Sequence, residues 1–173
     1  MKTTTILLTL LFACAGLLHA QTDIFSAARA NDTITVARLL DAGTPIDTVD
    51  SRGSTPLIIA AYNNNAETVS LLLRRHANPD VADKMGNTAL MGVCFRGYPA
   101  MGELLLRAGA QVNLPNYNGA TALTFAATFG HAELVKLLLG HGANKTAQDQ
   151  FGKTPLDHAR LQENDEIIRL LEQ

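Results

Sequence analysis

The side chains most often used in catalysis or metal binding are scattered through this sequence without a recognisable pattern. No serine lies in the Gly-x-Ser-x-Gly turn that presents a nucleophile, and no glycine-rich phosphate loop follows a strand. The histidines lack metal-ligand spacing, so we expect structural roles for them. We therefore predict no catalytic residue, no cofactor site and no metal site among the candidates, which are Ser26, Ser51, Ser54, Ser70, His76, His131, His141 and His158.

The composition is that of a folded domain with an aliphatic core. The chain has 173 residues, of which 47% are hydrophobic and 5% aromatic, and it contains no tryptophan. Its formal charge is −2, and it is one unit more negative without Lys2. Because nucleic-acid binding needs a basic stripe and like charges are not clustered here, we expect no nucleic-acid partner.

The first twenty residues have the pattern of a secretory signal peptide. Lys2 gives a positive start, residues 6–18 form an uncharged apolar run, and Ala20 is a small residue before Gln21. The run is shorter than the roughly 20 residues that a spanning helix needs, so we expect no membrane span. The protein is therefore expected to be exported, with the periplasm as the favoured location and secretion as an alternative.

The residues around Cys14 leave another alternative open. Leu11-Phe12-Ala13-Cys14 resembles a bacterial lipoprotein box, in which Cys14 would be lipidated and become the first residue. Phe12 is bulky for that motif, so cleavage before Gln21 is the favoured interpretation. Cleavage there leaves Cys94 without a second cysteine, and we expect Cys94 to be a small buried hydrophobic residue.

The strongest pattern in the chain is an internal repeat of 33 residues. Glycines at 53, 86, 119 and 152 each precede a threonine by two positions. The same register aligns Thr55-Pro56-Leu57, Thr88-Ala89-Leu90, Thr121-Ala122-Leu123 and Thr154-Pro155-Leu156. A period of about 33 residues with a Thr-Pro-Leu start is typical of stacked helical repeats.

Each unit predicts a pair of short helices preceded by a projecting loop. Thr55 and Thr154 can cap the first helix, with proline at its first turn, where a missing N–H costs little. The second helices carry packed aliphatic residues, for example residues 71–73 and 137–139. Each second helix should end at a left-handed residue, such as Gly43, Gly109 or Gly142.

The repeated motif resembles that of the ankyrin repeat family. The resemblance implies an all-α solenoid of helix-turn-helix repeats with short β-hairpin fingers, occupying residues 21–173 after a signal peptide at 1–20. Its expected parts are an N-terminal cap at about 23–49, repeats at about 50–82, 83–115 and 116–148, and a C-terminal cap repeat at about 149–173. The family's histidine after Thr-Pro-Leu is absent, being Ile58, Met91, Thr124 and Asp157 here, and its terminal glycine is His76 in the first repeat, which suggests mild strain.

Ankyrin repeats bind partners through their finger tips and the inner face of their first helices. Carried over by register, this resemblance predicts the partner-binding residues Arg52, Tyr62, Asn63, Lys84, Met85, Phe95, Arg96, Tyr117, Asn118, Thr128, Phe129, Phe151 and Leu161. Aromatic residues and arginine are common in interface hot spots. The alternative interpretation of Phe95 and Phe129 is that they only cover the neighbouring helix.

The resemblance implies a non-catalytic protein-binding module, expected to be a monomer, that captures a protein of unidentified nature in the cell envelope. Small exported bacterial proteins of this kind are associated with oxidative-stress defence and with neutralising or escorting partners. An enzyme or small-ligand-binding protein with its site in the groove is the alternative. A deep pocket with converging charges would favour that alternative, whereas a broad aromatic strip would favour protein binding.

The second repeat differs in composition from its neighbours. Gly92 and Gly102 lie in its expected helices, where each costs about 1 kcal/mol relative to alanine. Met85, Met91 and Met101 fall in the same unit, and methionine packs adaptably. We hypothesise that this repeat is the softest of the stack and adapts to a partner, with neutral sequence drift as the alternative.

Overall fold

The computed structural model describes residues 23–173, and the predicted signal peptide and Cys14 lie outside this range. The described residues form ten helices and no strand. The first helix of each pair is α2 (Ile24–Arg29), α4 (Pro56–Tyr62), α6 (Ala89–Arg96), α8 (Ala122–Thr128) or α10 (Pro155–Leu161). The second helix of each pair is α3 (Thr33–Asp41), α5 (Ala66–Arg74), α7 (Pro99–Arg107), α9 (Ala132–Gly140) or α11 (Asp165–Glu172).

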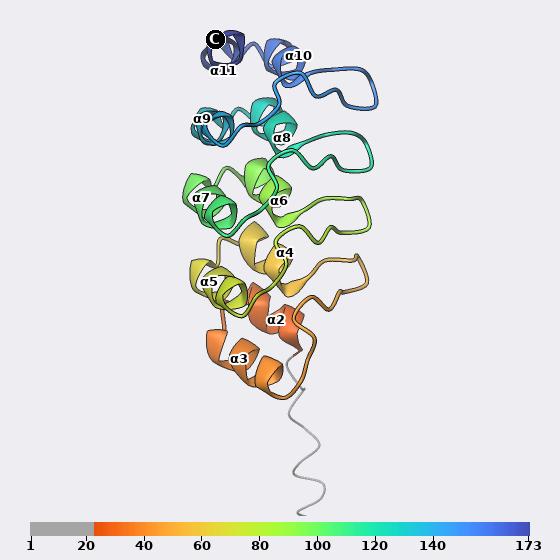
Figure 1. The fold of residues 1–173 in the computed structure, drawn as a ribbon, viewed down its shortest axis with the longest axis vertical. Coiled ribbons are helices and arrows are strands. Elements are labelled where there is room, and N and C mark those ends of the chain that lie inside the picture. Colours follow the sequence, from red (N-terminus) through yellow and green to blue (C-terminus); the bar gives the residue numbers. More distant parts are fainter. Residues whose placement is uncertain (1–22) are drawn as a thin grey trace, which may run out of the picture.

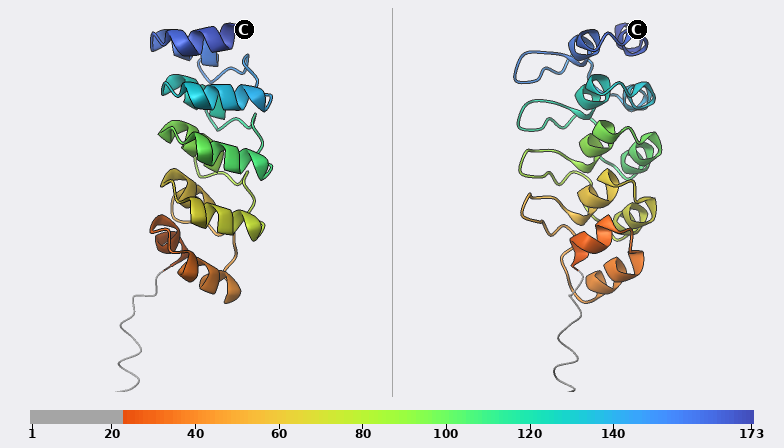
Figure 2. Two further views of the ribbon diagram at one scale, coloured as in Figure 1. Left: turned by 90° about the vertical axis from the view of Figure 1, so that its left-hand side faces the viewer. Right: turned by 180° about the vertical axis from the view of Figure 1, so that it is seen from behind.

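The five helix pairs stack in chain order into an elongated solenoid (Figure 1). The first helices form one row, the second helices form an outer row, and the loops before α4, α6, α8 and α10 project from the opposite side (Figures 1 and 2). Each helix contacts its pair partner, each first helix contacts the first helix of the next pair, and the second helices contact one another in the pairs α3 with α5, α7 with α9 and α9 with α11. The predicted all-α stack of repeats is therefore confirmed.

Threonine fixes the start of each first helix after α2. The N-caps are Thr55, Thr88, Thr121 and Thr154, and each hydroxyl accepts the backbone N–H of the residue three positions further on. In α10, Asp157 completes a reciprocal capping box by accepting the N–H and hydroxyl of Thr154. The predicted capping roles of Thr55 and Thr154 are confirmed.

Residues in the left-handed conformation end the second helices. Gly43, Gly109 and Gly142 have positive φ angles, as the sequence predicts, and they satisfy the last turn of α3, α7 and α9. His76 takes the same position after α5 with φ of 66°. His76 therefore has a left-handed backbone conformation that is unfavourable for an L-amino acid, as the mild strain predicted at this position requires.

The core runs continuously through the stack and is aliphatic. Its largest fully buried side chains include Leu57, Leu72, Leu90, Leu105 and Leu138. Small residues in the first helices, Ala60, Ala61, Val93, Cys94, Ala126 and Ala127, are completely buried, so neighbouring first helices can approach closely. Burial also raises the pKa of the Cys94 thiol far above its ordinary value, which leaves it in its unreactive protonated form.

The projecting loops contain four hairpin-shaped turns, which we call finger 1 (residues 50–54), finger 2 (83–87), finger 3 (116–120) and finger 4 (149–153). In each finger the backbone N–H of the first residue donates to the backbone carbonyl of the fifth, as Asp50 does to Ser54 at 3.0 Å. Adjacent fingers are also joined, because the N–H groups of Lys84, Tyr117 and Gln150 donate to the carbonyls of Arg52, Met85 and Asn118. The fingers are therefore tight turns linked in a ladder, without strand residues of their own.

The two helical glycines of the second repeat have different surroundings. A Cβ at Gly92 would meet only Tyr62 Cδ2, at an ordinary 3.5 Å. A Cβ at Gly102 would lie 2.9 Å from Leu134 Cδ2 and 3.2 Å from Leu137 Cδ2, and Leu134 is fully buried. Gly102 therefore permits close packing of α7 on α9, and the expectation that it only costs stability is wrong. Of the methionines expected to adapt to a partner, Met91 and Met101 are buried.

Alanine substitutions should separate these two glycines. We expect Gly92→Ala to raise the free energy of unfolding by about 1 kcal/mol, because alanine favours the helix and has room. Gly102→Ala should instead lower it by about 1 kcal/mol, since crowding of Leu134 outweighs the helix preference. Urea unfolding followed by circular dichroism measures both. Equal stabilisation by the two substitutions would contradict the packing role of Gly102.

Candidate functional site

The fingers project beside the row of first helices along the stack (Figure 1), and we call the surface between these two walls the groove. Two depressions lie in this groove and are lined by residues of both walls. One of about 580 Å³ lies beside fingers 1 and 2, and one of about 180 Å³ lies beside fingers 3 and 4. The groove is therefore an extended surface with shallow hollows, and its walls come from segments that recur at the repeat interval.

Aromatic side chains form a row along the helical wall. The rings of Tyr62 and Phe95 stack with centroids 6.0 Å apart, and Phe95 meets Phe129 edge to face at 4.6 Å. Phe125 continues the row, with its centroid 6.4 Å from that of Phe129. Phe95 is 37% exposed and Phe129 is 45% exposed, so both residues contact their neighbours and still expose part of their surface to solvent. A contiguous exposed apolar strip of this kind marks an interaction surface.

Arg96 is held in place within this row. Its guanidinium carbon lies 5.1 Å from the centroid of the Tyr62 ring and 5.6 Å from that of Tyr98. Its Nε and Nη2 donate to the Tyr98 hydroxyl at 3.2 and 2.9 Å. The hydrogen bond to Tyr98 raises the pKa of Arg96 further above its ordinary value. Arg96 is therefore a positioned cation with a fixed place beside Tyr62 and Tyr98.

The finger tips are held by the first residue of each finger. Asp50 Oδ1 accepts the backbone N–H groups of Arg52 and Ser54 at 2.8 and 2.9 Å. The equivalent bonds are made in the other fingers by Asp83, Asn116 and Asp149. Because the turn is fixed in this way, the tip residues point outward, and Tyr117 is 77% exposed. The other exposed apolar tips are Met85 and Phe151.

These hydrogen bonds lower the pKa values of the finger aspartates. Burial of Asp50 opposes its ionisation, but the N–H groups of Ser54 and Arg52 outweigh burial, so its pKa lies below the ordinary 3.8. Burial also opposes ionisation of Asp149, and there the Lys153 N–H and the His158 ring hold the pKa low. The charged carboxylate is therefore the form that stabilises fingers 1 and 4.

Acid should loosen the fingers. Because these pKa values are depressed in the folded state, the stability they supply is present above the unfolded-state pKa and is lost as pH falls through the folded-state value. The melting midpoint should therefore fall as pH drops below about 4. We expect Asp50→Asn to keep the turn, since Asn116 makes the same two bonds in finger 3, and to weaken the acid dependence. Thermal scans across acidic pH measure this; an unchanged acid dependence in the variant would contradict it.

His158 and Asp149 form an arrangement in the groove that resembles part of a catalytic site. His158 Nε2 lies 2.8 Å from Asp149 Oδ2, beside the smaller depression. The nearby hydroxyls of Thr124 and Thr128 are bonded elsewhere, to Thr121 and to the Thr124 carbonyl. Within residues 23–173 no hydroxyl or thiol is hydrogen-bonded to His158. The pair therefore joins finger 4 to α10 and lacks the nucleophile of a catalytic triad.

The structure places the predicted partner-binding residues along the groove, and all except Thr128 are exposed. The hydroxyl of Thr128 donates to the Thr124 carbonyl at 2.7 Å, and Asn63 Nδ2 donates to the Ile59 carbonyl at 2.7 Å. These two polar groups are therefore already used within their own helices. The exposed members are Arg52, Tyr62, Asn63, Lys84, Met85, Phe95, Arg96, Tyr117, Asn118, Phe129, Phe151 and Leu161.

Sequence reasoning missed three residues of the groove. Arg29 lines the larger depression, Phe125 extends the aromatic row, and Tyr98 holds Arg96. The signal for Arg29 was available, because it lies 33 residues before Tyr62 and so shares its register. No sequence pattern pointed to Tyr98, because the contact runs from the end of α6 across the turn to the cap of α7.

Within residues 23–173, no group of three or more His, Cys, Asp or Glu side chains could hold a metal ion. None of the helices there has the length and apolar character needed to cross a bilayer. A further depression, of about 930 Å³, lies on the outer side between α3 and α5 and is lined by side chains of both charges, Arg38, Asp41, Glu67 and Arg74.

Comparison with known proteins agrees with the geometry. The family described as ankyrin repeats (3 copies) matches residues 24–116 and also residues 92–173. No curated protein matches the chain. The two matched segments together span every helix of the described residues, and the chain therefore belongs to the ankyrin repeat family.

Proposed function

We propose that this protein is a non-catalytic binding module that captures a partner protein in its groove. Ankyrin repeats are generally protein–protein interaction modules that use an extended concave surface. The observation that carries the proposal is the row of half-exposed rings, Tyr62, Phe95 and Phe129, whose two ends line depressions together with finger residues. A partner that covered this strip would bury aromatic surface at little conformational cost, because hydrogen bonds already fix the finger turns beside it.

We further propose that the protein is exported as a monomer and acts in the cell envelope. The support is the sequence pattern of residues 1–20, with a positive start, an apolar run and a small residue before Gln21. In the envelope the groove would serve to escort, protect or inhibit the captured protein. Intact mass of the protein purified from its source distinguishes a chain that begins at Gln21 from one that begins at a lipidated Cys14.

A capture experiment tests the proposed function. Residues 21–173 carrying an affinity tag are incubated with the envelope fraction of the source organism, and bound proteins are identified by mass spectrometry. We expect one or a few proteins to be retained in stoichiometric amounts, and to be absent when aromatic groove residues are replaced. Retention of the same proteins by the groove variant would place the binding surface elsewhere and refute the proposal.

A further inference from the structure

We propose that the N-terminal half of the groove binds an acidic segment of the partner protein that also carries apolar side chains. This inference rests on the proposed function and adds the chemistry of the segment that is captured. It follows from three features of the groove: the sign of its exposed charges, the occupation of its carboxylates, and the apolar surface between the charges.

The exposed charges of the larger depression are basic. Arg29 comes from the end of α2, Arg52 from the tip of finger 1 and Lys84 from the tip of finger 2, and all three line this depression and are exposed. Arg96 adds a fourth cation where it stacks on Tyr62, which lines the same depression. The chain as a whole is acidic, with a formal charge of −2, so this cluster opposes the overall charge. It would attract an anionic segment selectively.

The carboxylates near these cations are already bonded to the finger backbone. Asp83, the acidic residue that lines the depression, accepts the N–H groups of Met85 and Asn87 at 2.8 Å each. Asp50 accepts two N–H groups of finger 1 and forms a longer salt bridge of 3.6 Å with Arg52, whose side chain stays 70% exposed. Within residues 23–173, Arg29, Lys84 and Arg96 form no salt bridge.

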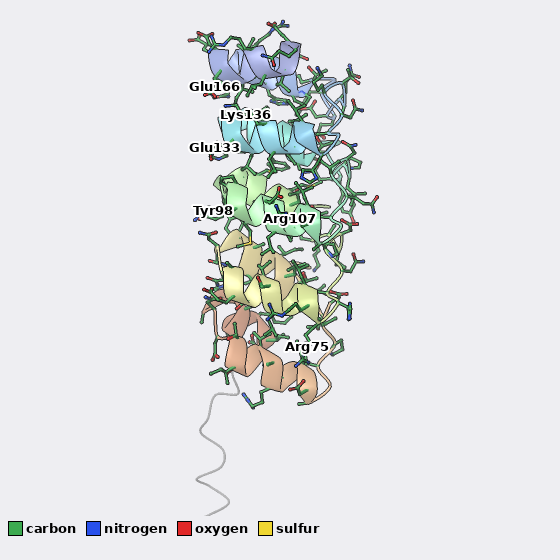
Figure 3. All side chains as sticks on the ribbon, turned by 60° about the vertical axis from the view of Figure 1, so that its left-hand side comes forward. Arg75, Tyr98, Arg107, Glu133, Lys136 and Glu166 are labelled. Carbon is green, nitrogen blue, oxygen red and sulfur yellow. The ribbon has the colours of Figure 1, made fainter. Side chains whose placement is uncertain are left out.

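The outer face carries salt bridges that join successive repeats. Lys136 of α9 bonds Glu166 of α11 at 2.8 Å, and the two side chains lie on neighbouring outer helices in Figure 3. Arg75 pairs with Asp41 at 2.8 Å, so this contact also joins successive repeats. Arg75 and Lys136 of the outer face are therefore paired with carboxylates of a neighbouring repeat, whereas Arg29, Lys84 and Arg96 of the groove remain available to an incoming carboxylate.

The surface between the cations is apolar and favours a polypeptide over a nucleic acid. Met85 and Tyr62 line the depression together with Ile58 and Ile59, which suits aliphatic or aromatic side chains. Stacking of nucleobases needs open aromatic faces. Arg96 lies over the Tyr62 ring, and Phe95 packs against the rings on both its sides. An extended segment in which acidic and apolar residues alternate would satisfy both features of this surface.

Three synthetic peptides of equal length test the charge preference. Each carries the same leucine and tryptophan residues, and the remaining positions are all Glu, all Gln or all Lys. We expect the Glu peptide to bind residues 21–173 about tenfold or more tighter than the Gln peptide, because several exposed pairs each add a few-fold. Its affinity should fall as salt is raised, and the Lys peptide should bind weakest. Fluorescence anisotropy measures the three dissociation constants.

Charge-changing variants locate the effect. Arg29→Gln, Arg52→Gln and Lys84→Gln combined should remove the preference for the Glu peptide, and the corresponding Glu variants should reverse it. The matched control, Arg38→Gln with Arg74→Gln on the outer side, should leave it unchanged, since these residues line the depression between α3 and α5. Circular dichroism checks that each variant is folded. If the Glu variant does not fold, the Gln variant alone tests the charge preference.

Three outcomes would overturn this inference. They are equal binding of the Glu and Gln peptides, loss of the preference in the Arg38 and Arg74 control, and tighter binding of single-stranded oligothymidine than of the Glu peptide. In the first case, capture of an envelope protein that depends on the aromatic row would still support the proposed function. If no envelope protein is captured but the Glu peptide binds at the basic cluster, the proposed function fails and the charge preference stands.

Discussion

Replacing Phe95 and Phe129 together by alanine is expected to weaken partner binding by about a hundredfold or more, since aromatic residues at the centre of an interface contribute most of its energy. The two rings contact each other at 4.6 Å and lie at the middle of the groove. Because 37% and 45% of the two residues are exposed, the melting midpoint should fall by only a few degrees.

A matched control separates binding from stability in this experiment. Ile34 of α3 is 81% exposed and lies on the outer side, beside the depression between α3 and α5. Ile34→Ala removes exposed apolar surface without touching the groove, so it should leave partner binding unchanged. Calorimetry with the captured partner and thermal scans of each variant measure both quantities. A large fall in stability of the phenylalanine variant would assign both rings to the core and remove them from the binding surface.

Replacing Gly86 by alanine is expected to have the second large effect, a loss of stability in the ladder of hydrogen-bonded fingers. Gly86 has φ of 82°, and a Cβ there would lie 2.7 Å from the backbone nitrogen of Tyr117 in finger 3. That nitrogen donates to the Met85 carbonyl at 3.1 Å, so finger 3 would have to move away and lose the bond. Backbone strain and the lost contact together should lower the free energy of unfolding by about 3 kcal/mol, or about 10 °C in melting midpoint.

Gly152 provides the control for Gly86→Ala. It holds the same position in finger 4 with φ of 71°, but a Cβ there meets nothing within 4 Å, because no finger follows. Gly152→Ala should therefore show the backbone strain alone, about 1 kcal/mol. The difference between the two variants measures the contact between fingers. Equal effects would mean that adjacent fingers do not depend on each other, and that the ladder does little to hold the groove wall.

The repeat register explains why much of the fold could be predicted from the sequence. Thr55 and Thr154 cap helices, and Gly43, Gly109 and Gly142 end them, because each role depends on a few neighbouring residues. The same register placed Tyr62, Phe95 and Phe129 on an exposed face. Local capping and a constant repeat length are therefore sufficient to define the architecture and the wall on which the groove is built.

Contacts between repeats could not be predicted in the same way. A glycine inside a helix, such as Gly102, is expected to lower stability. Here its missing side chain lets Leu134 and Leu137 pack against α7. The pairing of His158 with Asp149 and the stacking of Arg96 on Tyr62 depend on side-chain geometry that repeat spacing does not specify. The basic cluster joins Arg29, Arg52 and Lys84 from three separate segments, so no charge run in the sequence reveals it.

Site-specific photocrosslinking is the most direct test of the claim that the groove holds the partner. A benzoylphenylalanine at the exposed Tyr117, at the tip of finger 3, would meet a partner bound in the groove, whereas Glu133 lies on the outer helix α9 (Figure 3). After incubation with the envelope fraction and irradiation, we expect a crosslinked partner from position 117 and none from position 133. A partner crosslinked from position 133 and not from position 117 would place binding on the outer helices and contradict the groove as the binding surface.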